Sequence, residues 1–293
     1  MASTASRLAL GTVQFGLSYG IANEVGQVAP DEGVAILSHA RRHGIDTLDT
    51  AVAYGDSERR LGEAGVAGWR VVSKLPPVPS GCGDVAGWAR QEVAGSLARL
   101  RVPRLEALLA HRAQDLAGAH AAILYHTMTE LKREGKVLKI GASVYAPGDL
   151  ETIVLRFPLD LVQAPLNIID RRIAASGWLA RLHDSGVEVH TRSAFLQGLL
   201  LMPNSVRPAA FQRWQPLWTA WDRWQAQSGQ TAVRACLAFV LSHPEVDRVV
   251  VGVDSLRQLE DILTTDIEAS MPPPDDLVSG DLDLIDPSRW RTS

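Results

Sequence analysis

Eight short apolar segments, spread along the whole chain and separated by segments of helical period, constrain the fold of this sequence more than any other feature. They are rich in β-branched residues and bounded by turn residues, as buried strands are. Strands that alternate with helices pair in parallel, because a parallel neighbour needs a connection long enough to hold a helix. Eight such units within 293 residues predict an α/β fold, a closed (β/α)8 TIM barrel. The predicted strands are residues 8–10, 45–48, 70–74, 105–110, 137–141, 159–163, 187–191 and 246–251.

Helical segments are expected in the gaps between these strands. The clearest are residues 32–42, 85–99, 119–134, 173–184 and 231–242. Gly44, Gly135 and Gly186 each stand between a helical segment and the next strand, where a helix C-cap favours a residue that tolerates positive φ. No change of composition and no low-complexity linker divides the chain, so we expect a single domain over residues 1–293.

Two segments fall outside the repeating plan. The longest insertion, residues 192–230, follows the seventh strand and carries Trp214, Trp218, Trp221 and Trp224 on one helical stripe. This stripe packs the insertion on the barrel, forms a wall over a substrate, or contacts a second copy. The acidic segment 265–293 contains three successive prolines and is expected to lie over the surface as an extended strap, with Trp290 fixing its end.

Charge and cysteine content exclude several classes of partner. The formal charge is −4 with no basic run, so we expect neither nucleic acid nor an anionic membrane as a partner. Cys82 and Cys236 are far apart and have no histidine cluster nearby, which predicts no metal site. Residues 1–7 lack the apolar core of a secretory signal, and no stretch reaches about 18 apolar residues, so a cytoplasmic protein with a small-molecule partner is expected.

Polar side chains follow the predicted strands where the active site of such a barrel lies. Asp49 ends the second strand with Tyr54 just beyond it, Lys74 ends the third strand, and His111 follows the fourth. Taken alone, each residue fits a structural role: Asp49 in a turn, Lys74 as a solvated side chain, and His111 as a structural hydrogen-bonding residue. Together they would face one small volume, because the carboxyl ends of barrel strands converge.

Carbonyl reduction requires this set of side chains. Hydride transfer to a carbonyl leaves an alkoxide that must take a proton, and a phenol can supply one if its pKa, near 10, is lowered. Lys74 beside Tyr54 is expected to favour the phenolate, with Asp49 holding the ammonium group. A ring N–H of His111 can orient the carbonyl oxygen. The hydride itself needs a cofactor.

These residues and their neighbours closely resemble the aldo-keto reductase superfamily over nearly the whole chain. The shared segments are Leu10-Gly11-Thr12, residues 49–55 with Ser57-Glu58, Ser73-Lys74, residues 108–112, residues 139–143, Val162-Gln163, and Asn167 before Asp170-Arg171-Arg172. The resemblance implies Tyr54 as general acid/base, Lys74 and Asp49 as its tuners, and His111 as the substrate-orienting residue. It also implies a nicotinamide dinucleotide, NADP or NAD, bound without a Rossmann domain, which agrees with the absence of a Gly-x-Gly-x-x-Gly segment after a strand.

The same resemblance assigns positions to the cofactor. They are Gly11, Thr12, Ser143, Gln163, Arg192, Ser193, Gly252, Ser255 and Gln258. Val144 stands where an asparagine often follows the serine, and Arg192 stands near the usual place of a stacking aromatic residue. Arg192 either stacks through its guanidinium plane or meets a phosphate.

Residues 249–261 resemble the family's adenosine-phosphate site, a loop and helix N-terminus after the last strand. Members selective for NADP place Lys and Arg around the 2′-phosphate, whereas the nearest equivalents here are Gly252 or Val253 and Gln258, with Arg257 adjacent. Asp254 either caps the following helix, which we favour, or disfavours the extra phosphate.

Segments 11–16 and 195–200 are similar to a bacterial branch often grouped with surface-polysaccharide sugar metabolism. Tyr19, Trp88 and the tryptophan insertion are candidates for sugar stacking, although packing at the rim explains each equally well. We therefore expect a reductase or dehydrogenase of an aldehyde, ketone or sugar carbonyl. The alternatives are a nucleotide-sensing regulator that acts through a protein partner, and a scaffold barrel with vestigial residues.

Overall fold

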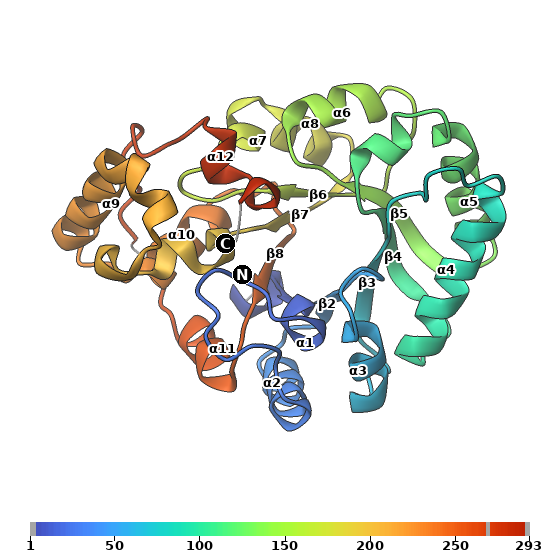
Figure 1. Ribbon diagram of the computed structural model, residues 1–293, viewed down its shortest axis with the longest axis horizontal. Coiled ribbons are helices and arrows are strands. Elements are labelled where there is room, and N and C mark those ends of the chain that lie inside the picture. The colour runs from blue at the N-terminus through green and yellow to red at the C-terminus, as the bar shows by residue number, and fades with distance from the viewer. Residues whose placement is uncertain (1–3, 268–269, 291–293) are drawn as a thin grey trace.

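The computed structural model describes residues 4–267 and 270–290, and it contains a closed barrel of eight parallel strands in the order β1 to β8 (Figure 1). Register places the carboxyl ends of neighbouring strands at one level, since Gly11 pairs with both Asp49 and Gly252, and Ser143 pairs with Gln163. All eight predicted strands are confirmed, with ends that shift by at most two residues. The strands are β1 Leu8–Gly11, β2 Thr47–Asp49, β3 Arg70–Leu75, β4 Leu105–Ala110, β5 Val137–Ser143, β6 Leu161–Pro165, β7 Glu188–Arg192 and β8 Arg248–Gly252.

Helices surround the barrel as the alternating pattern predicted. The five predicted helical segments are all helical, but the fourth is broken into α7 and α8 at Gly177, whose φ of +77° does not fit a continuous helix. The helices are α1 Val13–Gly16, α2 Pro30–Arg42, α3 Ser57–Ala64, α4 Val85–Leu100, α5 Ala121–Arg133, α6 Pro147–Ile153, α7 Arg172–Ala175, α8 Trp178–Asp184, α9 Gln215–Ser228, α10 Ala232–Leu241, α11 Leu256–Leu263 and α12 Leu282–Ile285. The three glycines expected at helix C-termini have the positive φ that this position favours, +91° at Gly44, +73° at Gly135 and +72° at Gly186.

The insertion after β7 is a helical subdomain at the left of Figure 1, built from short 3-10 turns and α9. Trp218, Trp221 and Trp224 of α9 are buried, and Trp218 donates its indole N–H to the carbonyl of Phe211 at 2.8 Å. Trp214 precedes α9, in the turn Ala209–Trp214. The packing interpretation of the tryptophan stripe is therefore the one that the structure supports.

The described residues of the C-terminal strap have no regular secondary structure between α11 and α12, and the strap ends in α12 and a turn, Pro287–Arg289. Arg171 donates to the carbonyls of Pro274 and Leu277, which holds the strap to the loop after β6. Trp290 fixes the end as expected, because its ring packs edge-on against Phe211 of the insertion, with ring centroids 4.9 Å apart, while its indole N–H donates to the carbonyl of Leu284 at 3.1 Å. Residues 268–269 and 291–293 of the predicted strap lie outside the described residues, as do residues 1–3 of the N-terminal segment.

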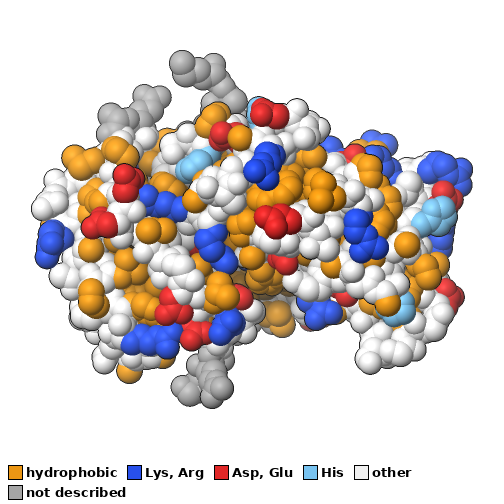
Figure 2. Space-filling model, turned by 90° about the horizontal axis from the view of Figure 1, so that it is seen from above, with side chains coloured by type: hydrophobic (Ala, Val, Ile, Leu, Met, Phe, Trp, Pro, Cys, Tyr) orange, Lys and Arg blue, Asp and Glu red, His pale blue; other side chains and the backbone are white. Residues whose placement is uncertain are grey.

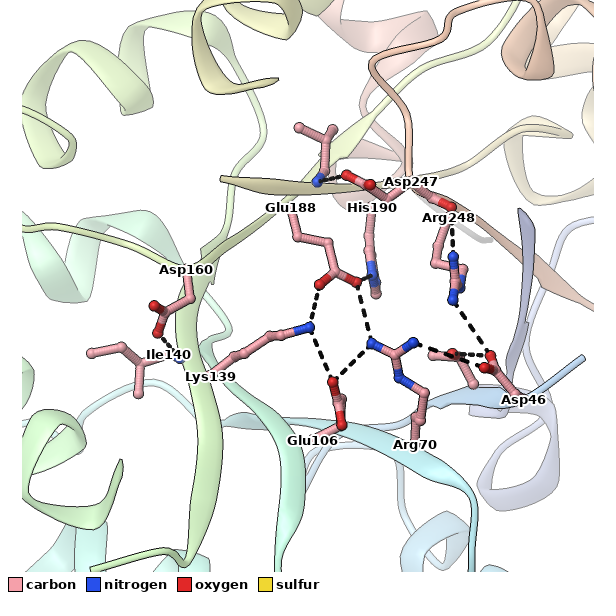
Figure 3. Close-up of polar contacts among 12 residues, drawn as sticks. Asp46, Arg70, Glu106, Lys139, Ile140, Asp160, Glu188, His190, Asp247 and Arg248 are labelled. Carbon is pink, nitrogen blue, oxygen red and sulfur yellow. Dashed lines mark hydrogen bonds and ion pairs between the residues drawn. The ribbon is translucent and has the colours of Figure 1, made fainter. Parts of the chain in front are cut away.

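An ion cluster that the sequence did not suggest fills the amino-terminal end of the barrel (Figure 3). Arg70 of β3 pairs with Glu106 of β4 at 2.8 Å, and Lys139 of β5 pairs with Glu106 at 3.0 Å and with Glu188 of β7. The buried His190 also contacts Glu188, at 2.8 Å. Because these groups come from four strands, the cluster ties the strands together at the end opposite to their carboxyl termini.

The surface carries no field of one charge on the face that Figure 2 presents, where acidic and basic side chains are intermixed. None of the helices in the described part of the chain has the length and hydrophobicity that a membrane crossing requires.

Candidate active site

A cavity of about 590 Å³ opens at the carboxyl ends of the strands. Seven strands contribute residues to its lining. Six of these residues lie at or just after a strand end and Gln163 lies in the middle of β6: Gly11, Asp49, His111, Ser143, Gln163, Arg192 and Gly252. Such convergence is where barrel enzymes bind ligands. The cavity continues from these residues to Asp261 and Ile262 of α11, so one space joins the middle of the barrel to the helix after β8.

A buried ion pair forms the floor of this site. Lys74 Nζ lies 2.6 Å from Asp49 Oδ1 and donates to the carbonyl of Thr50 at 2.9 Å, and the side chains of Lys74 and Asp49 are 1% and 5% exposed. Gln163 donates to the other carboxylate oxygen of Asp49 at 2.6 Å. Both oxygens of the buried carboxylate are thus satisfied, which a buried charge requires.

Tyr54 and His111 stand above this pair, and both line the cavity. Their ring centroids are 5.7 Å apart in an edge-on arrangement, and Lys74 Nζ lies 5.0 Å from the centre of the Tyr54 ring. The structure therefore brings together all four residues that the sequence singled out.

The electrostatics of Tyr54 differ from the sequence-based expectation. Burial, followed by the negative charge of Asp49, raises the pKa of Tyr54 above its usual value of 10. Lys74 was expected to lower it, but its ammonium group forms its hydrogen bonds with Asp49 and Thr50. Tyr54 is therefore a neutral phenol at neutral pH and carries a proton that it can donate.

His111 and Lys74 are also shifted by their surroundings. Burial, reinforced by the positive charge of Lys74, lowers the pKa of His111 to about 4, so the imidazole is neutral at neutral pH. Burial lowers the pKa of Lys74 too, against the opposing effect of Asp49. A neutral imidazole still has one N–H to donate to a carbonyl oxygen.

Hydroxyl groups and a second carboxylate hold the loop that carries Tyr54. Ser57 Oγ donates to the carbonyl of Thr12 at 2.8 Å and lies 3.0 Å from Thr50 Oγ1. Glu58, in the next position, is buried and accepts from Ser73 at 2.6 Å and from Arg99 at 2.8 Å. These contacts give the Ser57-Glu58 segment a structural purpose, since they fix the start of α3 against β1 and β3.

Most residues assigned to a cofactor do line the cavity. They are Gly11, Thr12, Ser143, Gln163, Arg192, Ser193, Gly252 and Gln258. Ser255 does not, because its hydroxyl caps α11 by accepting from the amide of Gln258 at 3.3 Å. The prediction that Asp254 caps this helix is therefore wrong: its carboxylate accepts from Asn23 at 3.1 Å.

Arg192 lies among aromatic and backbone groups of the loop after β5. Its guanidinium carbon is 4.4 Å from the centre of the Tyr145 ring, and it donates to the carbonyl of Val144 at 3.1 Å. This contact shows stacking of the guanidinium on an aromatic ring of the protein itself.

Sequence reasoning missed several lining residues, among them Asn23, Tyr145, Pro287 and Ser288, and it gave no separate role to Gln14 and Asp261, which also line the cavity. Gln14 has a buried side-chain oxygen without a hydrogen-bond partner, and a Cβ added at Gly252 would lie 2.5 Å from its amide nitrogen. The cavity is elongated, and here it has a buried polar atom without a partner next to a glycine that leaves room for a ligand. These features fit an extended ligand with polar groups, such as a dinucleotide. Of the sugar-stacking candidates, Tyr19 lines the cavity, whereas Trp88 and the four tryptophans of the insertion do not.

No group of three or more His, Cys, Asp or Glu side chains within residues 4–267 and 270–290 is placed to hold a metal ion.

Comparison with known sequences identifies the family. The profile of the Aldo/keto reductase family matches residues 7–265. The chain belongs to this family. As an aldo/keto reductase it is an NAD(P)H-dependent oxidoreductase that acts on carbonyl compounds.

Two similar proteins and one solved structure illustrate the relationship. The chain is 29% identical to L-galactose dehydrogenase of Arabidopsis thaliana, over 87% of this chain and 83% of that protein. It is 27% identical to the NADH-specific methylglyoxal reductase of Escherichia coli, over 88% and 89%. The holo form of an aldo-keto reductase from Bacillus halodurans superposes with a TM-score of 0.71 at 20% identity, over 92% of this chain and 89% of that chain, which shows the shared fold.

Proposed function

We propose that this protein, a single barrel domain, reduces the carbonyl group of a small aldehyde, ketone or sugar with a hydride from a nicotinamide dinucleotide, and that Tyr54 donates the proton. The observation that carries the proposal is the placement of Tyr54 and His111 in the cavity directly above the buried pair of Lys74 and Asp49. A structural role would not require two uncharged proton-donating groups to face the same open space.

Each residue has a defined part in the proposed step. A bound nicotinamide supplies the hydride, and Ser143 and Gln163 would hold its carboxamide. His111 donates its N–H to the carbonyl oxygen and orients it. As the carbonyl carbon accepts the hydride, the oxygen takes the phenolic proton of Tyr54, which leaves an alcohol and a tyrosinate that regains a proton from water. Lys74 stabilises the tyrosinate by its charge, and Asp49 holds Lys74 in place.

Tyr54 holds its proton at neutral pH, which is the state that carbonyl reduction uses. Alcohol oxidation needs the tyrosinate first. Because the pKa of Tyr54 is raised, we expect the rate of reduction to stay level through the moderately alkaline range, and the rate of alcohol oxidation, which needs the tyrosinate, to rise with pH there.

The test is turnover of a panel of aldehydes, ketones and sugars by wild type and Tyr54→Phe with NADH and NADPH. Loss of a general acid lowers kcat by about 10²- to 10⁴-fold, while nucleotide binding, measured by protein fluorescence, should persist. Tyr145→Phe is the matched control, because Tyr145 also lines the cavity and keeps the ring on which Arg192 stacks.

Three results would contradict the proposal. Full activity of Tyr54→Phe would remove the assigned proton donor. Nucleotide binding without turnover of any carbonyl would favour the nucleotide-sensing regulator. Failure to bind either nucleotide would exclude both functions and leave a scaffold barrel.

A further inference from the structure

The two ends of the active-site cavity carry opposite charge. Arg192 is the only lysine or arginine among the described residues that line it, and it lies at the Tyr54 end, where it stacks on Tyr145. The end beneath α11 is lined by two carboxylates, Asp254 and Asp261. A ligand that extends from Tyr54 to α11 therefore meets negative side chains at its far end.

A third carboxylate occupies the N-terminus of α11. Glu32 of α2 accepts a hydrogen bond from the amide of Leu256 at 2.6 Å, and Ser255 accepts one from the amide of Gln258. Free amides at a helix N-terminus bind phosphate well, but two amides of this first turn already have partners. Glu32 also adds a full negative charge where a phosphate would have to approach.

Asp254 is held in the cavity wall by neutral partners. It accepts from the side-chain amide of Asn23, and its own backbone amide donates to Gln258 Oε1 at 2.8 Å. No lysine or arginine of the described chain lies within ion-pair distance of Asp254, so its charge is not neutralised locally. This contact uses the side-chain oxygen of Gln258, and it places the neutral Gln258 side chain, not a lysine or arginine, beside Asp254 in the cavity wall.

The reacting ring of a nicotinamide cofactor must lie at Tyr54 and His111, so its adenosine end must extend toward α11. NADP carries a phosphate with nearly two negative charges on the adenosine ribose. NAD has a hydroxyl group at the same position, and this hydroxyl can donate a hydrogen bond to a carboxylate. We propose that Glu32, Asp254 and Asp261 make this enzyme select NADH over NADPH. The inference rests on the proposed function, since it assumes that a nicotinamide dinucleotide binds in this cavity.

The experiment measures dissociation constants of NADH and NADPH by calorimetry for the purified chain and for Asp254→Asn, Glu32→Gln and the double variant. Wild type should bind NADH at least about tenfold more tightly than NADPH. Two unit charges about 4 Å apart in water interact by about 1 kcal/mol, which is a factor of about five in affinity. Each variant should therefore tighten NADPH about fivefold, while NADH changes less than twofold. Glu260→Gln is the control, because Glu260 lies on the same helix but neither lines the cavity nor accepts from the amides of Leu256 and Gln258 in the first turn.

A second measurement needs no variant. Raising the salt concentration screens charge repulsion, so the preference of wild type for NADH should shrink between about 0.05 and 0.5 M salt. Equal affinities for the two nucleotides, or a preference that neither the variants nor salt change, overturns the selectivity but leaves the proposed function intact. Failure of wild type to bind either nucleotide overturns both.

Discussion

Replacing Glu188 with glutamine tests whether the ion cluster at the amino-terminal end of the barrel stabilises the fold. Glu188 accepts hydrogen bonds from Lys139 and His190, and Arg70 Nη2 lies 4.0 Å away. Glutamine has nearly the same shape but no charge, and its NH₂ group would face other donors. The substitution therefore removes the charge while it preserves the packing.

The size of the effect follows from the pKa of Glu188. Burial alone would raise it, but the hydrogen bonds from His190 and Lys139 lower the pKa from 4.5 to about 2. At 1.36 kcal/mol per pH unit this difference corresponds to about 3 kcal/mol of folding free energy, which is an upper limit because the side chains of Glu188 and Lys139 are 18% and 28% exposed and solvent screens the pair. We expect Tm to fall by at most about 6 °C, at roughly 2 °C per kcal/mol for a chain of this size.

The pH dependence has a definite sign. The lowered pKa stabilises the folded state above pH 4.5, and this contribution is lost as pH falls from 4.5 through about 2. The difference between wild type and Glu188→Gln should thus be complete at pH 7 and smaller by about 1.4 kcal/mol at pH 3.5.

Urea unfolding followed by tryptophan fluorescence at both pH values measures this difference. Glu134→Gln, which breaks the exposed pair of Glu134 with Arg90, is the control and should unfold at the same urea concentration as wild type. Equal stability of wild type and Glu188→Gln at pH 7, or a difference that grows on acidification, would refute the reasoning.

Three further outcomes are expected from other parts of the structure. Gly141→Ala should abolish soluble folded protein, because the new Cβ would lie 1.8 Å from a backbone carbonyl oxygen of β6, whereas Gly148→Ala, with open space around the new Cβ, should fold normally. Expression level and circular dichroism measure both outcomes. The kcat/KM of reduction should stay constant on acidification until about pH 4, where His111 gains its proton, and an apparent pKa of 6.5 assigned to His111 would contradict the burial argument. A thiol reagent should label Cys82 in the native protein and Cys236 only after unfolding, since Cys236 is fully buried and burial raises its pKa, and rapid labelling of both would show that the core is more open than described.

The sequence predicted the barrel because its signal is local and repeated. Each strand is a short apolar run next to a helical segment, so errors at single boundaries do not change the topology. The break between α7 and α8 was missed because a glycine inside a helical pattern is normally tolerated, and only the tertiary path shows that Gly177 has positive φ.

The four central residues of the site were also predictable, because the end of a strand fixes where each side chain lies. The charge states of these residues were not predictable, because the direction in which the Tyr54 pKa shifts depends on burial and on the hydrogen bond between Lys74 and Asp49. Asp254 and Ser255 are both good capping residues, and the backbone turn alone decides that Ser255 caps α11. Lining residues such as Asn23 come from loops whose course no periodicity encodes.

The wall of the cavity is built in part from the last segment of the described chain. Pro287 and Ser288 line the space, and Trp290 beside them packs edge-on against Phe211 of the insertion, with ring centroids 4.9 Å apart. A change in the insertion can therefore move the cavity wall without altering any lining residue. Variant libraries aimed at new substrates should include Phe211 and Trp290, which a choice based on contact with the ligand would leave out.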